Sequence, residues 1–269
     1  MLIDTHAHLD RYPEESLGAA LEEIRDIPIF TISTSMDLPS YQRNREIAEG
    51  CEWALPTCGV HPWNAPEYAD RLEELRPWIE GSPMLGEIGL DFHWVEDPAC
   101  YPAQRQVLEF FLRAAQEQGK IVNLHTKGAE AEILELLDRY HIRRAVVHWY
   151  SGPLDIFREM LGRGFFFTIG VEVSHSSHIQ TLAREVPLAQ MLTETDNPGG
   201  LKWLTGEMGM PHHLEGVIQT IADLKGSSPE MIRQTVHRNL LNLFQDDLWL
   251  PTLYVELLSG GESGDIAHP

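Results

Sequence analysis

Short apolar runs alternate with amphipathic helical stretches over most of this chain, and that alternation limits the folds it can adopt. We expect strands at residues 2–8, 27–33, 53–60, 83–88, 120–125, 142–148, 165–171 and 188–195, with helices between them, for example at 102–118 and 128–139. Repeated strand–helix units favour a parallel sheet over a sandwich. The chain has 269 residues, close to the ~250 typical of one (β/α)8 barrel. We therefore predict an α/β fold, a distorted (β/α)8 TIM barrel that closes on itself.

The pattern changes after residue 200, where a loop is expected, followed by extra helices near 211–225, 229–237 and 239–245 that pack over the last helical positions of the barrel. Because the alternation leaves no linker, residues 1–247 are predicted to form one domain. Residues 248–269 are predicted to be a C-terminal extension that is partly disordered, since the final SGGESGDIAHP is nearly free of apolar residues.

Composition excludes several classes of protein. The chain contains no run of 18 apolar residues, and no basic segment followed by an apolar one precedes Asp4, so we expect neither a membrane span nor a signal peptide, and a cytoplasmic location. Its three cysteines include no C-x-x-C pair, which argues against disulfides and a cysteine zinc site. A net charge of −21 argues against a wide nucleic-acid-binding groove, although divalent ions in a site attract phosphate locally.

Polar residues gather at the ends of the predicted strands, where the chemistry of a parallel barrel takes place. The candidate ligands are His6 and His8 on the first strand, Glu87 on the fourth, His125 on the fifth, His148 on the sixth and Asp196 on the eighth. His6 and His8 share one face of their strand because they are alternate residues. These nitrogen and oxygen donors are enough to hold two divalent ions, Zn, Mn, Mg, Ni or Co, bridged by Glu87 and a hydroxide.

Each ligand assignment has a structural alternative. His125 alone could be a buried histidine bonded to backbone, and His148, beside Trp149 and Tyr150, could pack against aromatic rings. Asp196 could cap a turn, or it could hold a water and take its proton. The coincidence of all these residues at strand ends favours the metal site.

Further polar residues lie near the same strand ends. His61 is either a turn histidine before Pro62 or a substrate contact at the barrel mouth. Asp91 and Glu194 are predicted to orient metal ligands through hydrogen bonds. Lys127 could bind a substrate anion or neutralise nearby carboxylates.

The motifs, taken in order, resemble the TatD family of metal-dependent hydrolases, which belong to the amidohydrolase-like barrels. The match runs from IDTHAHLD through GVHPWNAPE, GEIGLDF, NLHTKGAE, VVHWYSGP and TETDNPG to IADLKGSSPEMIRQTVHRNLLNLF, over about residues 2–245. The resemblance implies that the six candidate ligands form a binuclear site, that His61 lies at the substrate mouth and that Asp196 assists the attacking water. Family members are usually described as deoxyribonucleases, and others are linked to editing of aminoacyl-tRNA.

The sequence departs from the family pattern at two places. The family commonly has His-x-Arg after the fifth strand, where this chain has His125-Thr126-Lys127. Its usual Arg-Asn-x-Pro run is replaced by LKWLTGEMGMPHHLEG. Arginine makes bidentate phosphate contacts that lysine cannot reproduce, so these departures concern the substrate rather than the metals.

We therefore expect a hydrolase whose binuclear metal site activates water, with Asp196 and Glu87 as catalytic residues. The leading interpretation is a TatD-type deoxyribonuclease that acts on DNA ends or short single strands. The alternatives are a hydrolase of a small-molecule amide, lactone or phosphoester, and an aminoacyl-tRNA editing enzyme. A non-enzymatic alternative is a metal-binding barrel that serves as a partner-binding module, but a module would not require an open binuclear site. The sequence leaves the oligomeric state open.

Overall fold

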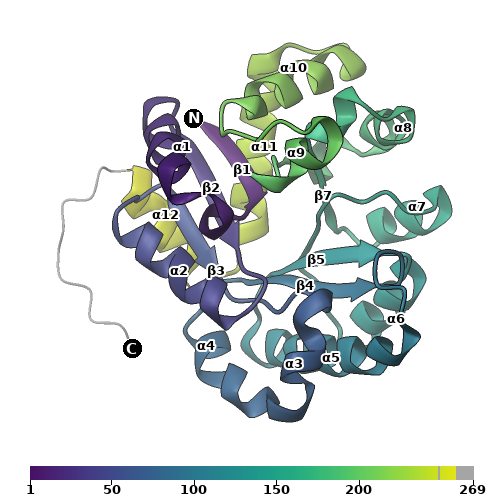
Figure 1. Ribbon diagram of the computed structural model, residues 1–269. Helices are drawn as coiled ribbons and strands as arrows, with labels where there is room; N and C mark the ends of the chain where they lie inside the picture. Colours follow the sequence, from purple (N-terminus) through teal and green to yellow (C-terminus); the bar gives the residue numbers. More distant parts are fainter. Residues whose placement is uncertain (248, 259–269) are drawn as a thin grey trace.

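A computed structural model describes residues 1–247 and 249–258. Parallel strands stand at the centre of the molecule and helices surround them (Figure 1). The strands are β1 (Leu2–Ala7), β2 (Ile29–Thr34), β3 (Ala54–Thr57), β4 (Leu85–Asp91), β5 (Val122–Lys127), β6 (Ala145–Val147), β7 (Phe166–Ile169) and β8 (Met191–Thr193). All the predicted strands are present, although most are shorter than the sequence indicated.

Backbone hydrogen bonds divide the strands into two parallel sheets, with the orders β1-β2-β3 and β4-β5-β6-β7-β8. One isolated bridge, between Cys58 and Leu85, links the region of β3 to β4. Side chains join β8 to β1, because Thr5 Oγ1 donates to Thr193 O at 2.9 Å and Thr193 Oγ1 donates to Ile3 O at 2.5 Å. The predicted barrel is therefore distorted, as expected, and its backbone ladder is interrupted at two seams.

The helices follow the strands in the order expected of repeated units. They are α1 (Glu14–Asp26), α2 (Leu38–Glu49), α3 (Ala65–Tyr68), α4 (Arg76–Glu80), α5 (Tyr101–Gln118), α6 (Glu130–Arg139), α7 (Leu154–Gly162), α8 (Ser177–Glu185), α9 (Gly199–Thr205), α10 (His213–Lys225), α11 (Pro229–Phe244) and α12 (Leu250–Leu258). The predicted helices at 102–118 and 128–139 correspond to α5 and α6. Helix α5 ends at Gly119, whose φ of 65° is the left-handed conformation that glycine adopts without strain.

Two predictions about the C-terminal third are wrong. The helices expected at 229–237 and 239–245 are one continuous helix, α11, because neither glycine nor proline stands between them to break it. The loop expected after residue 200 begins as helix α9, which ends where Gly206 has a φ of 86°. Helix α11 contacts both β8 and β1, so it covers one of the seams of the barrel.

Helix α12 packs against the opposite end of the barrel from the carboxyl ends of the strands. Tyr254 is 1% exposed, and its ring centroid lies 4.9 Å from that of Phe30 near the start of β2. The predicted disorder of residues 259–269 falls outside the described residues. In the described ranges, no helix is both long and apolar enough to span a membrane.

We predict that Tyr254→Ala lowers the free energy of unfolding by about 3 kcal/mol, because a large buried ring is replaced by a cavity. Urea unfolding followed by circular dichroism measures the change. Val255→Ala is the matched control, since Val255 is the next residue and is 60% exposed. Equal midpoints for the two variants would contradict a structural role for α12.

Candidate metal centre

The carboxyl ends of the strands bring the predicted ligands into one cluster. His6 lies on β1, Glu87 on β4 and His125 on β5, while His8, His148 and Asp196 follow β1, β6 and β8. The pairing register shifts along both β1 and β4 at the ligand positions, between Asp4 and Ala7 and between Leu85 and Ile88. The cluster therefore lies where the regular ladder is interrupted, which is where strands re-aim side chains.

Glu87 occupies the centre of the cluster. Its Oε2 lies 3.3 Å from His8 Nε2 and 3.5 Å from His6 Nε2. Its Oε1 lies 2.9 Å from His125 Nδ1 and 3.0 Å from His148 Nε2. The two oxygens of this buried carboxylate thus face two separate sets of imidazole nitrogens.

Asp196 lies on the side of the cluster formed by the first strand. Its Oδ1 is 3.4 Å from His8 Nε2 and 3.9 Å from His6 Nε2, and its side chain is 23% exposed. The φ of Asp196 is 51°, a left-handed conformation that is strained for a residue other than glycine. Backbone hydrogen bonds hold this turn in place, since Asp196 N donates to His6 O at 2.9 Å. The turn therefore fixes a carboxylate that solvent can reach.

The outer nitrogens of His6 and His8 are held by neighbouring acceptors. His8 Nδ1 donates to the Thr34 carbonyl oxygen at 3.1 Å. Asn123 Oδ1 lies 3.0 Å from His6 Nδ1, and the same amide donates through Nδ2 to Thr5 O at 2.9 Å, so Oδ1 is an acceptor. In their neutral form, both histidines consequently carry the lone pair on Nε2, the nitrogen that faces the cluster, as metal ligands do.

The sequence interpretation missed Asn123, although a signal for it was present. Asn123 stands two residues before His125 on the same strand, so alternation places both side chains on one face. A polar residue at that position in a buried strand needs a partner, and the partner here is His6.

Asp91 and Glu194 lie where the sequence places orienting groups. His125 Nε2 donates to Asp91 Oδ2 at 3.1 Å, and His148 Nδ1 donates to Glu194 Oε2 at 3.3 Å. Burial alone lowers the pKa of His148, but the carboxylates of Glu87 and Glu194 raise it to about 10. Burial alone raises the pKa of Asp91, whereas hydrogen bonds from His125 and from the Trp94 amide lower it below its usual range.

His61 is buried, at 3% exposed, and its role as a substrate contact at the barrel mouth stays a prediction. Its Nδ1 accepts from Trp63 N at 3.2 Å, so it caps a turn, and its Nε2 lies 3.4 Å from Glu87 Oε1 and 3.2 Å from His125 Nδ1. Burial lowers the pKa of His61 to about 4, so the ring is neutral. Because Nδ1 is the acceptor, Nε2 carries the proton, and His61 faces the cluster as a hydrogen-bond donor.

Lys127 anchors a loop in this structure. Its ammonium donates to the Trp149 carbonyl oxygen and, at 2.9 Å, to Ser151 Oγ, which ties the end of β5 to the loop after β6. Burial lowers the pKa of Lys127. Binding of a substrate anion by Lys127 stays a prediction.

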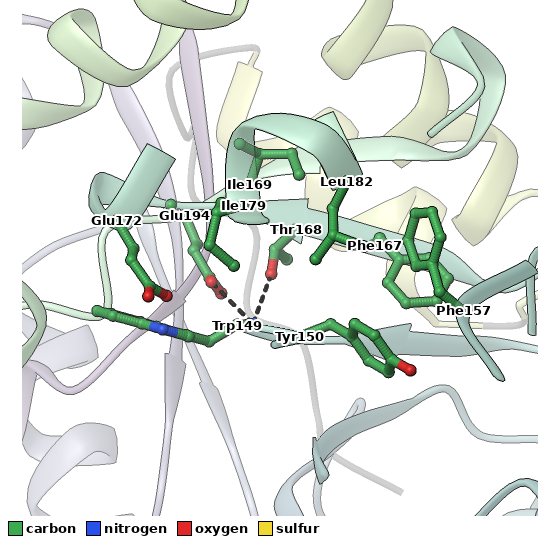
Figure 2. A pocket seen from close by; sticks show the side chains of 11 residues that line it. Trp149, Tyr150, Phe157, Phe167, Thr168, Ile169, Glu172, Ile179, Leu182 and Glu194 are labelled. Atoms are coloured by element: carbon green, nitrogen blue, oxygen red, sulfur yellow. Dashed lines mark hydrogen bonds between the residues drawn. The ribbon is translucent and has the colours of Figure 1, made fainter. Parts of the chain in front are cut away.

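Figure 2 shows a small cavity beside Trp149, whose backbone N–H donates to Glu194 Oε1 and Thr168 Oγ1. Phe157 and Phe167 line its apolar side. Its volume of about 10 Å³ is room for roughly one water molecule. This cavity is therefore too small to admit a substrate.

Parallel strands ringed by helices, with imidazole and carboxylate groups at their carboxyl ends, define a barrel with a candidate metal centre. A family model described as TatD related DNase matches residues 3–245. The chain therefore belongs to the TatD family, and the resemblance seen in the motifs is confirmed.

Known proteins resemble the chain over nearly its whole length. The uncharacterized metal-dependent hydrolase YcfH of Escherichia coli K12 is 28% identical over 263 residues, covering 91% of this chain and 96% of YcfH. The human deoxyribonuclease TATDN3 is 26% identical over 261 residues, covering 90% and 94%. The crystal structure of YjjV, a TatD homologue from E. coli K12, superposes with a TM-score of 0.81 at 25% identity, covering 91% and 98%. This structural likeness confirms the predicted barrel.

We predict that Asn123→Ala weakens zinc binding about 10- to 100-fold, because His6 loses the acceptor that orients its ring. Competition with a chromophoric chelator measures the affinity, and circular dichroism checks that the variant is folded. Asn242→Ala, at an exposed position of α11, is the control. Parent-like affinity in folded Asn123→Ala protein would show that His6 needs no such support.

Proposed function

We propose that this chain, a metal-dependent hydrolase of the TatD family, uses two divalent ions to cleave phosphodiester bonds at DNA ends or in short single strands. The observation that carries the proposal is the position of Glu87. Its Oε2 faces His6 and His8, and its Oε1 faces His125 and His148. A carboxylate that presents one oxygen to each of two ligand sets suits a pair of ions that share a bridge.

The chemistry of the donor set fits such ions. One ion would be held by His6, His8, Glu87 and Asp196. The other would be held by Glu87, His125 and His148. Each of these histidines has its outer nitrogen engaged by an acceptor and its inner nitrogen free to coordinate. Imidazole and carboxylate ligands suit Zn, Mn, Ni or Co. Ions bound here would lower the pKa of water towards about 7 and polarise the phosphoryl oxygen.

Asp196 is the residue that we assign to proton transfer. Burial alone raises its pKa, but the hydrogen bond to His8 and the charges of His8 and His148 lower it, so the carboxylate is ionised at neutral pH. It accepts a proton from the water that attacks phosphorus. The bond between phosphorus and the leaving oxygen then breaks, and Asp196 returns the proton to that oxygen.

His61 complements Asp196 as a hydrogen-bond donor. Its inward nitrogen carries a proton, because the other nitrogen accepts from Trp63 N. A neutral donor at this place suits a phosphoryl oxygen, which accepts hydrogen bonds. We therefore keep His61 as a substrate contact.

Two observations bear on the substrate: one supports phosphodiester chemistry, and the other favours strand ends over a long duplex. The family model and TATDN3 carry deoxyribonuclease names, which supports phosphodiester chemistry. The net charge of −21 and the engagement of Lys127 by its own loop leave few cations to grip a duplex backbone. Short or terminal substrates need fewer of these contacts.

We predict that Glu87→Gln reduces the metal content from close to two ions per chain to about one, since the amide keeps the shape of the bridge but not its charge. Elemental analysis after dialysis against Zn or Mn gives the count. Glu230→Gln, at a side chain that is 65% exposed, is the control. Retention of both ions and full turnover by Glu87→Gln would exclude a bridging role.

We predict that Asp196→Asn lowers kcat at least about 100-fold, the scale expected for loss of a positioned acid–base group, while metal content falls less. The assay is a screen of the metal-loaded protein on oligonucleotides, phosphoesters, lactones and acylated amines. We expect hydrolysis of oligonucleotide ends. Turnover confined to lactones or acylated amines would contradict the phosphodiester assignment, and unchanged turnover in the variant would remove Asp196 from the mechanism.

A further inference from the structure

Three tryptophans with largely exposed rings follow the carboxyl ends of three strands. Trp63 lies in the turn after β3, Trp94 in the loop after β4 and Trp203 on α9, after β8. Their exposed fractions are 52%, 48% and 64%. Single apolar side chains on a surface are ordinary, but large aromatic rings gathered at the end that carries the candidate metal centre are not.

Trp94 and Trp203 are in contact with each other although they are far apart in the sequence. Their ring centroids are 5.4 Å apart and the ring planes meet at 79°, an edge-to-face arrangement. Trp203 is held in place by α9, whose start is fixed when Gly200 N donates to Asp196 O at 2.7 Å. The pair is thus connected through the backbone to the turn that carries Asp196.

Asp91 connects the same aromatic residues to the metal centre. Its Oδ2 accepts from Trp63 Nε1 at 2.7 Å and from His125 Nε2 at 3.1 Å. Its Oδ1 accepts from the backbone N–H of Trp94 at 2.7 Å. One carboxylate therefore holds a candidate metal ligand and two of the exposed tryptophans, which ties the segments that carry Trp63 and Trp94 to the candidate metal centre.

We propose that Trp94 and Trp203 bind the nucleobase next to the scissile phosphate by stacking. The proposal rests on the phosphodiesterase function argued above and names the part of the substrate that the protein grips. Stacking on an aromatic ring is uncharged and accepts every base, so it suits a chain whose charge of −21 gives little attraction for phosphates.

Stacking on an indole ring also favours one kind of DNA strand over another. Inside a duplex, both faces of each base are covered by its neighbours, so an indole ring has no face to reach. A terminal base, or a base of a single strand, has a free face. The tryptophan pair therefore favours strand ends and short single strands over duplex interiors.

The test compares two sets of oligonucleotides that differ only at one terminal residue, which carries a base in one set and is abasic in the other. The comparison is made first at one end of the strand and then at the other. With the base present, Trp203→Ala and Trp94→Ala are expected to raise KM about ten-fold with little change in kcat. With the abasic end, parent and variants should have equal KM. Trp203→Phe, which keeps a ring, should recover most of the loss. Trp94→Ala leaves the bond to Asp91 intact, because that bond is made by the backbone.

Met231→Ala is the matched control, since Met231 on α11 is as exposed as Trp94, at 48%, and lies on a helix distant in sequence from the cluster. Its KM should not change. An equal loss by the tryptophan variants on base-bearing and abasic ends would overturn the stacking proposal while leaving the phosphodiesterase function standing.

If the parent protein hydrolyses no oligonucleotide, the proposed function fails. The stacking proposal is then tested separately, by the binding of a nucleotide. Titration of the zinc-loaded protein with thymidine 5′-monophosphate should quench tryptophan fluorescence, and the double variant Trp94→Ala/Trp203→Ala should lose at least half of that quenching. Equal quenching in parent and double variant, or none in the parent, would overturn it.

Discussion

The rest of the structure depends on a buried carboxylate at the centre of the barrel. Glu87 is 2% exposed, and an ionised carboxylate taken out of water costs several kcal/mol unless charge and hydrogen bonds offset it. Its pKa is nevertheless well below the usual range, because the surrounding imidazoles, among them His148 and His6, outweigh the effect of burial. These rings come from strands or loops on both sheets, so the seams of the barrel have to meet before the carboxylate is stabilised.

Two sequence features were enough to predict the strands and to identify the six candidate ligands. They are the alternation of apolar runs with helical stretches and the polar residues that end those runs. What the sequence could not supply was contact between distant segments. The seam between β8 and β1 depends on Thr5 and Thr193, two hydroxyls that look like ordinary strand residues. The approach of His61 Nε2 to within 3.4 Å of Glu87 Oε1 depends on the meeting of two strand ends, and the engagement of Lys127 depends on the loop after β6. Each of these contacts joins residues whose pairing leaves no local pattern.

Hydrogen bonds around the cluster divide its histidines into two chemical kinds. Where the outer partner is an acceptor, as the Thr34 carbonyl is for His8, the inner nitrogen is left with a lone pair. Where the outer partner is a donor, as Trp63 N is for His61, the inner nitrogen carries a proton. The outer hydrogen-bond partner therefore decides whether a neutral histidine faces the cluster as a base towards a cation or as a donor towards an anion.

Asp91 is a shared acceptor, and sharing has a thermodynamic consequence. The same carboxylate holds His125 on one side and the tryptophans on the other, so any change in its position is felt by both. If a ligand bound on one side of Asp91 orders this carboxylate, it also favours binding on the other side. Thermodynamic linkage requires the two effects on affinity to be equal. His125 of the candidate metal centre and the exposed tryptophans Trp63 and Trp94 thus share one hydrogen-bond acceptor, through which a ligand bound at one would influence binding at the other.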